Sequence, residues 1–198
     1  MNGELSYEER ESVGKLMSGL FMVIMLNIVV SIFIALGEGA YEEKDGILFV
    51  AGIVSFLFLT VYGVLLIAID KWCSGYNTAG ILCIAYAIVN LITSLMEKTN
   101  IIITIIIMIM IILKDYKEID AHTYLMKKIQ NRDVEWSKLS DMLGAYISVY
   151  VISLVLAALI PPVGAIGALV AAIIYLVFSI KKWIYLNKTA KILKEEME

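Results

Sequence analysis

The sequence predicts an all-α integral membrane protein, a bundle of six transmembrane helices arranged as three hairpins. Hydrophobic residues make up 61% of the 198 residues and charged residues only 18%, whereas about a quarter of a soluble domain is charged. The mean hydropathy is +0.86. Six apolar runs divide the chain, and basic residues gather in alternate segments between them. We therefore treat residues 1–198 as a single transmembrane domain.

The apolar runs predict the individual spans, since a helix needs about 20 apolar residues to cross the hydrocarbon of a bilayer. Four runs reach or approach this length: Leu16–Leu36, Ile47–Ile69, Ala79–Met96 and Leu143–Ile160. Glutamates outnumber arginine within residues 1–11, unlike the basic start of a signal peptide, so we expect the first span to remain uncleaved. A fifth run, Val163–Ile180, follows Pro161 and Pro162. Because proline cannot continue a helix, these two residues predict a tight turn between antiparallel spans.

The sixth run, Ile101–Leu113, is short at thirteen residues. It crosses the bilayer if the flanking Lys98 and Lys114 extend their side chains to the two interfaces or if the bilayer thins locally. The alternative is a re-entrant or half-buried helix. Charge favours a crossing, because the basic segment 115–141 would otherwise lie on the opposite side from the other basic segments.

The distribution of lysine and arginine predicts the orientation. With six crossings, fourteen of the sixteen basic residues lie on the side of the termini, and only Lys44 and Lys98 lie on the other. Because cytoplasmic loops carry the excess of positive charge, we expect a multi-pass protein of the cell membrane with both termini in the cytoplasm.

An internal repeat relates the first and third hairpins. Seven identities occur at a constant offset of 111 residues, from Ile69 against Ile180 to Leu82 against Leu193. They include Trp72 and Trp183, which also fit interfacial anchors at cytoplasmic helix ends. Anchors alone arise by convergence, but the Thr-Ala-x-Ile-Leu that follows each of them favours duplication. The two hairpins then form a parallel repeat, as in many transporters.

Uncharged polar residues form stripes along the odd-numbered spans, which all run outward. With two acidic residues at the outer ends, these stripes predict an outward-facing polar vestibule for a cation or small solute. Its members are Asn27, Ser31 and Glu38 on the first span, Tyr86, Asn90, Ser94 and Glu97 on the third, and Tyr150 on the fifth. The alternative, which we favour, is that these groups hydrogen-bond between packed helices, as is routine in membrane bundles.

Small residues predict a helix-packing face on the last span. Gly164, Gly167, Ala168 and Ala172 lie along it, and small residues at such spacing let two helices approach closely. The partner is left open: it is either the preceding span or a second subunit.

The segment 115–141 is the longest stretch outside the spans, and we expect an amphipathic helix on the inner leaflet. His122 lies within it, and we expect this side chain on the surface. A cytoplasmic active site would have to be built from this histidine and from Asp70, Asp115, Glu118 and Asp120. No spacing among these residues matches a known catalytic motif. Cys73 and Cys83 show no metal-ligand spacing. We expect no enzyme activity, no cofactor and no bound metal.

The predicted function is that of a non-catalytic membrane protein, an accessory, assembly or immunity-type subunit that acts through helix and lipid contacts. The expected partners are membrane lipid and either a second copy of the chain or another membrane protein. We expect no nucleic-acid partner, because the net charge of −3 gives no support for the concentrated basic surface that phosphate binding needs. The alternative is a small transporter or channel subunit. No charged residue lies at the middle of a span, which argues against a proton relay.

The orientation is testable by labelling with a membrane-impermeant thiol reagent. Glu43→Cys and Arg132→Cys are made separately in a chain whose own Cys73 and Cys83 are replaced by alanine. We expect the reagent to label Glu43→Cys in intact cells, and Arg132→Cys only after the cells are lysed. Labelling of both from the same side contradicts the six-span topology.

Overall fold

The computed structural model describes residues 5–38, 44–96 and 101–195. Within these ranges the chain forms six α-helices and no β-strand, which confirms the all-α class. The helices are α1 (Tyr7–Glu38), α2 (Lys44–Asp70), α3 (Tyr76–Ser94), α4 (Ile101–Lys128), α5 (Ser137–Leu159) and α6 (Pro161–Glu195).

Five of the helices in the described part of the chain are long and apolar enough to cross a membrane: α1, α2, α3, α5 and α6. The chain is thus a helical membrane protein by the length and composition of its helices. Helix α4 is not among the five, because Lys114, Asp115, Lys117 and Glu118 directly follow its apolar run. The sixth crossing remains a prediction that rests on charge.

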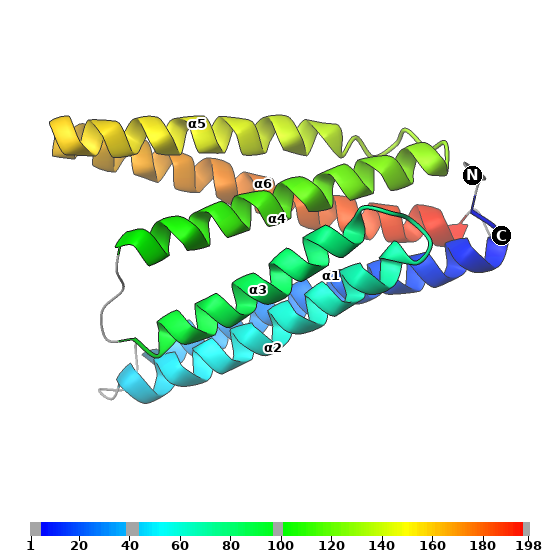
Figure 1. Cartoon of the computed structure of the whole chain (residues 1–198), viewed down its shortest axis with the longest axis horizontal. Helices are drawn as coiled ribbons and strands as arrows, with labels where there is room; N and C mark the ends of the chain where they lie inside the picture. The colour runs from blue at the N-terminus through cyan, green and yellow to red at the C-terminus, as the bar shows by residue number, and fades with distance from the viewer. Residues whose placement is uncertain (1–4, 39–43, 97–100, 196–198) are drawn as a thin grey trace.

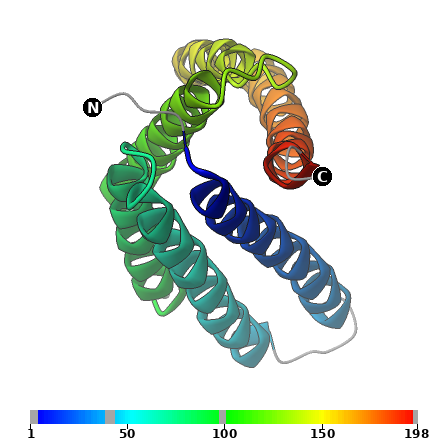
Figure 2. The ribbon, with the colours of Figure 1, turned by 90° about the vertical axis from the view of Figure 1, so that its right-hand side faces the viewer.

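The six helices form a ring in which each helix packs on its neighbours in the chain and α6 packs on α1 (Figure 2). The start of α1, the end of α6 and the connections 71–75 and 129–136 all lie at one end, at the right of Figure 1. We call this the closed end. Toward the opposite, wide end, where α5 turns into α6, the α5–α6 hairpin diverges from α1 and α2 (Figures 1 and 2).

The hydrophobic core lies at the closed end. Its buried side chains come from the beginning of α1, α3 and α5, from the later parts of α2, α4 and α6, and from the two connections at that end. Among the largest are Trp136, Tyr76, Phe178, Met17 and Leu66, each almost fully buried. At the wide end, by contrast, residues such as Leu159 and Ile166 are exposed, as expected where lipid would cover the helices.

The α2–α3 connection begins at Asp70, whose Oδ1 accepts hydrogen bonds from the backbone N–H groups of Gly75 (2.8 Å) and Asn77 (3.0 Å). Gly75 has φ +110°, a conformation that favours glycine because a Cβ would be strained there. The carboxylate of Asp70 is therefore used to start α3.

The predicted small-residue face of α6 has two parts. A Cβ on Gly164 would collide with the backbone of Ala157 on α5, and a Cβ on Gly167 would collide with Ser153. The chain reverses at Ile160, and Pro161 and Pro162 are the first residues of α6 instead of a separate turn. The glycines then let α5 and α6 pack closely. Ala168 and Ala172 are exposed.

The two segments matched in the predicted repeat differ in local structure. Residues 71–75 form a turn between two helices, whereas residues 182–186 continue α6 without a break. Lys71 is exposed, but its counterpart Lys182 is 7% exposed. The repeat therefore stays a prediction from sequence.

Candidate functional site

Helix α4 carries three ionisable residues into the core beyond its apolar run. Asp115, Glu118 and His122 are spaced i, i+3 and i+7, which places them on one helical face. They are 1%, 0% and 0% exposed. The prediction that His122 lies on the surface is wrong, because residues 115–128 continue α4 into the packed closed end instead of forming a separate helix.

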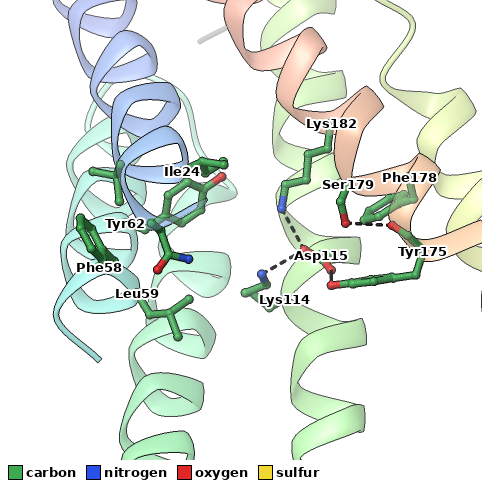
Figure 3. A pocket seen from close by; sticks show the side chains of 12 residues that line it. Ile24, Phe58, Leu59, Tyr62, Lys114, Asp115, Tyr175, Phe178, Ser179 and Lys182 are labelled. Atoms are coloured by element: carbon green, nitrogen blue, oxygen red, sulfur yellow. Dashed lines mark hydrogen bonds and ion pairs between the residues drawn. The ribbon is translucent and has the colours of Figure 1, made fainter. Parts of the chain in front are cut away.

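Lys182 on α6 joins the two carboxylates of α4. Its Nζ lies 2.8 Å from Asp115 Oδ1 and 2.7 Å from Glu118 Oε2. Lys114 Nζ contacts the same Asp115 oxygen at 3.1 Å. These four residues, Lys114, Asp115, Glu118 and Lys182, form what we call the ionic cluster, and Figure 3 shows its Asp115 contacts. With two positive and two negative charges, the cluster is neutral as a whole.

Two tyrosine hydroxyls complete the hydrogen bonding of the carboxylates. Tyr62 on α2 donates to Glu118 Oε1, and Tyr175 on α6 donates to Asp115 Oδ2 at 3.2 Å. Each carboxylate thus receives an ammonium and a hydroxyl, as a charge must when it is removed from water. The ionic cluster and its tyrosines connect α2, α4 and α6.

His122 belongs to an aromatic group next to the ionic cluster. Its ring stacks on Trp136 with a centroid separation of 3.9 Å, and its Nδ1 lies 2.7 Å from the hydroxyl of Tyr76. We call Tyr76, His122 and Trp136 the histidine stack. Trp136 Nε1 donates to Thr189 Oγ1 on α6 at 3.1 Å. The stack thereby joins α3, α4, the 129–136 connection and α6.

The ionic cluster favours charged carboxylates and a neutral imidazole. Burial alone would raise the pKa of Glu118, but the ammonium of Lys182 and the neighbouring His122 hold it well below its ordinary value. Burial also opposes ionisation of Asp115, and here the ammonium groups of Lys114 and Lys182 prevail and lower the pKa. For His122, burial lowers the pKa and outweighs the opposing effect of Glu118. None of these three groups is therefore poised to exchange protons at neutral pH.

A pocket of about 250 Å³ lies beside the ionic cluster, between α1, α2, α4 and α6 (Figure 3). Lys114, Asp115 and Lys182 contribute charged groups to its wall, and α1 contributes Asn27. The buried Oδ1 of Asn27 has no hydrogen-bond partner among the residues that the structure describes. Amide oxygens rarely remain unpaired when buried, so the pocket has an unused polar group.

Of the residues predicted for the vestibule, Asn27 is the one that lines this pocket. Tyr86, Asn90 and Tyr150 are half-buried, and Ser31 and Ser94 are exposed, on α1, α3 and α5. Ser94 donates its hydroxyl hydrogen bond to Leu91 O of its own helix at 2.8 Å. The Glu38 side chain and Glu97 lie outside the described residues. The vestibule therefore stays a prediction from sequence, and the charged pocket is a different site.

Trp72 and Trp183, the two predicted interfacial anchors, are both half-buried. Trp183 stacks on Phe21 of α1 with a centroid separation of 5.5 Å and an interplanar angle of 8°. Trp72 lies under the ammonium of Lys71, 5.2 Å from the ring centroid, and its carbonyl accepts a hydrogen bond from Lys128 Nζ at 2.8 Å. Trp183 thus packs between helices, in addition to any contact with the interface.

Sequence reasoning missed the ionic cluster although part of its signal was present. Asp115, Glu118 and His122 repeat at helical spacing directly after an apolar run, which predicts one acidic face if the helix simply continues. Their cationic partner, Lys182, is 64 residues from Glu118 in the chain, and the sequence gives no means of pairing them. Asp70 and Asp120, considered with them, are not part of the cluster: Asp70 starts α3, and Asp120 is exposed. Within the described ranges, no group of His, Cys, Asp and Glu side chains is placed to hold a metal ion.

Comparison with known proteins gives no relative for this chain. No family model matches it, and neither a curated protein nor a solved structure does so.

The lowered pKa of His122 predicts that the protein loses stability on mild acidification. Below the ordinary histidine value of 6.5, the unfolded chain binds a proton at His122 that the folded chain does not. The free energy of unfolding therefore decreases as the pH is lowered, by at most about 1.4 kcal/mol per pH unit. We expect the thermal midpoint of the purified protein in detergent to fall steadily between pH 7.5 and pH 5.5.

His122 is the only histidine in the chain, so His122→Gln serves as the matched variant. It is expected to be less stable at pH 7.5 because it loses the stack, but its midpoint should change little across the same pH range. A wild-type midpoint that is constant or rises on acidification contradicts the burial of a neutral imidazole.

Proposed function

We propose that this chain is a non-catalytic integral membrane protein, an accessory, assembly or immunity-type subunit that acts through helix and lipid contacts. The observation that carries this proposal is that the buried charged side chains pair with one another. Lys182 contacts both carboxylates, and each carboxylate also accepts a tyrosine hydroxyl. Groups held in this way stabilise one arrangement of helices, whereas a catalytic acid or base must exchange protons with a substrate.

The charge states support the same conclusion. The lowered pKa values of Asp115 and Glu118 keep both carboxylates ionised, and burial keeps His122 neutral. A general acid or base works best when its pKa is near the pH of the cell. These residues are better suited to joining α2, α4 and α6 than to proton transfer.

The surface supports contacts with lipid and with another helix. Large apolar side chains such as Val155, Leu159, Ile166 and Leu169 are exposed along α5 and α6. Ala168 on α6 is exposed as well, and small residues of this kind let a second transmembrane helix approach closely. The partner that we propose is membrane lipid together with a second copy of the chain or another membrane protein.

We also propose that the closed end lies in the cytoplasm, in a multi-pass protein of the cell membrane. Lys71, Lys128 and Lys138 lie at or next to the connections of this end, and Lys191 lies near the end of α6. The positive-inside rule places such a surface against the inner leaflet, where lysine and arginine are also attracted to anionic lipids.

One observation favours a second candidate, a small transporter. The pocket between α1, α2, α4 and α6 contains charged groups and the unpaired Oδ1 of Asn27, and transporters place their substrate sites between helices within the bilayer. In this candidate a polar solute would bind in the charged pocket, and not in the vestibule that the sequence predicts.

A flux assay separates the two functions. Purified chain is reconstituted in liposomes, and the swelling of the vesicles is followed by light scattering in potassium chloride, potassium acetate and glycerol. The accessory role predicts rates equal to those of protein-free liposomes for all three solutes. Solute flux well above that background contradicts it and supports the transporter.

Two asparagine variants show whether any such flux uses the pocket. Asn27 lines the pocket and Asn90 does not, so Asn90→Leu is the matched control for Asn27→Leu. The transporter predicts that flux is lost in Asn27→Leu alone, with its thermal stability kept. A packing role for Asn27 predicts lower thermal stability in detergent.

A further inference from the structure

We propose that the pocket beside the ionic cluster is a binding site for a small amphiphilic carboxylate, with its anionic oxygens at Lys114 and its apolar part against α1 and α2. The proposal holds for either function considered above, because it concerns binding and not passage across the membrane. It rests on the hydrogen-bonding capacity that the ionic cluster leaves unused, on the apolar wall opposite, and on the unpaired oxygen of Asn27.

The lysines in the pocket wall have more N–H donors than the neighbouring side chains have acceptors for them. Each lysine ammonium has three N–H donors. Among the described residues, Lys182 donates hydrogen bonds to Asp115 and Glu118, and Lys114 forms an ion pair with Asp115. The Asp115 carboxylate already accepts from both lysines and from Tyr175. The unused groups are therefore ammonium donors, which a carboxylate satisfies with charge-assisted hydrogen bonds.

Lys114 is placed to be the main contact. Its side chain is 12% exposed, and Figure 3 shows it extending from α4 toward the side of the pocket where Tyr62 and Leu59 of α2 lie. It touches the ionic cluster only through Asp115 Oδ1, an oxygen that it shares with Lys182. A ligand anion can thus bind Lys114 while the contacts of Lys182 remain in place.

The opposite wall is apolar. Val23 and Ile24 of α1 and Phe58 and Leu59 of α2 line it. A free inorganic anion would leave this wall against water, whereas burial of apolar area contributes roughly 25 cal/mol per Å². The combination of ammonium donors on one side and aliphatic and aromatic carbon on the other suits a ligand with a charged head and a short hydrocarbon body.

The dimensions of the pocket limit the ligand. Its volume of about 250 Å³ far exceeds the roughly 10–15 Å³ that holds one water molecule, yet it lies just below the range of about 300–1,000 Å³ typical of drug-sized ligands. A medium-chain acid is therefore a better match than a whole phospholipid. Asn27 Oδ1, buried and unpaired, is available to a hydroxyl or water that accompanies the carboxylate.

Octanoate is the probe for the experiment. The full chain is placed in nanodiscs of zwitterionic phospholipid, and binding of radiolabelled octanoate is measured by equilibrium dialysis, with empty nanodiscs subtracted. We expect saturable binding of about one octanoate per chain, as for a single pocket. Octan-1-ol has the same tail without the charge, and acetate has the charge without the tail, so neither should compete at the same concentration.

Variants connect the binding to the pocket. Lys114→Met should weaken octanoate binding about tenfold or more, since a charge-assisted hydrogen bond contributes enough free energy for such a change. Lys117→Met, on the exposed side of the same helix, is the matched control and should bind like the wild type. Ile24→Trp fills the pocket without removing a charge and should also abolish binding, which keeps the test valid if Lys114→Met does not fold.

Competition by dodecanoate identifies the source of the ligand. Stronger competition by dodecanoate than by unlabelled octanoate supports a fatty acid taken from the bilayer, and weaker competition supports a short, water-soluble acid. Both results support the site. The proposal is overturned if octanoate shows no saturable binding, if Lys114→Met or Ile24→Trp binds as the wild type does, or if acetate competes equally well.

Discussion

Lys182 lies buried between Asp115 and Glu118, and the placement of the other helices depends on this contact. Two carboxylates on one face of α4 cannot enter an apolar core without positive charge, because an unpaired buried ion is strongly disfavoured. The partner comes from α6, so at the closed end α6 must pass within reach of a lysine side chain from α4. Tyr62 then fixes α2 against Glu118, and the histidine stack brings α3 and the 129–136 connection to the same place. The bundle is thus joined at one end and diverges toward the other.

This arrangement accounts for the two different halves of the molecule. The closed end contains the hydrophobic core and the ionic cluster, whereas the wide end consists of apolar helices whose side chains are largely exposed. Helices in lipid gain little from burying apolar surface against one another, since lipid is equally apolar. The specific polar contacts therefore decide where the helices meet. The pocket lies where the ionic cluster ends and the helices begin to separate. One part of its wall is therefore charged and the other part apolar.

The sequence predicted the all-helical class and the positions of the apolar runs, because hydropathy and run length are local properties. The end of α5 directly before Pro161 and the close packing of Gly164 and Gly167 on α5 also follow from local steric rules. The candidate site was not predicted, because the contacts that join Asp115 and Glu118 to other helices involve residues 56 to 67 positions apart. The middles of the predicted spans have no charge, which argued against a proton relay. The charges lie just beyond Leu113 and Ile180, where the core of the closed end and not water surrounds them. Asn27 was selected for its polarity on an apolar face, and its side chain does line the pocket, but its charged neighbours come from α4 and α6.

The most direct test of this account is a double-mutant cycle between Lys182 and Glu118, with unfolding followed in mixed detergent micelles. The variants are Lys182→Met, Glu118→Gln and the pair together, and Lys181→Met is the exposed control. Lys182→Met leaves the buried Glu118 without an ammonium partner, and such a loss typically costs about 3–5 kcal/mol. Glu118→Gln is expected to cost less, because Lys182 keeps its contact with Asp115. The account predicts that the double variant loses less stability than the two single losses combined, by at least about 1 kcal/mol, and that Lys181→Met loses almost none. Additive losses, or a Lys182→Met variant as stable as Lys181→Met, would contradict it.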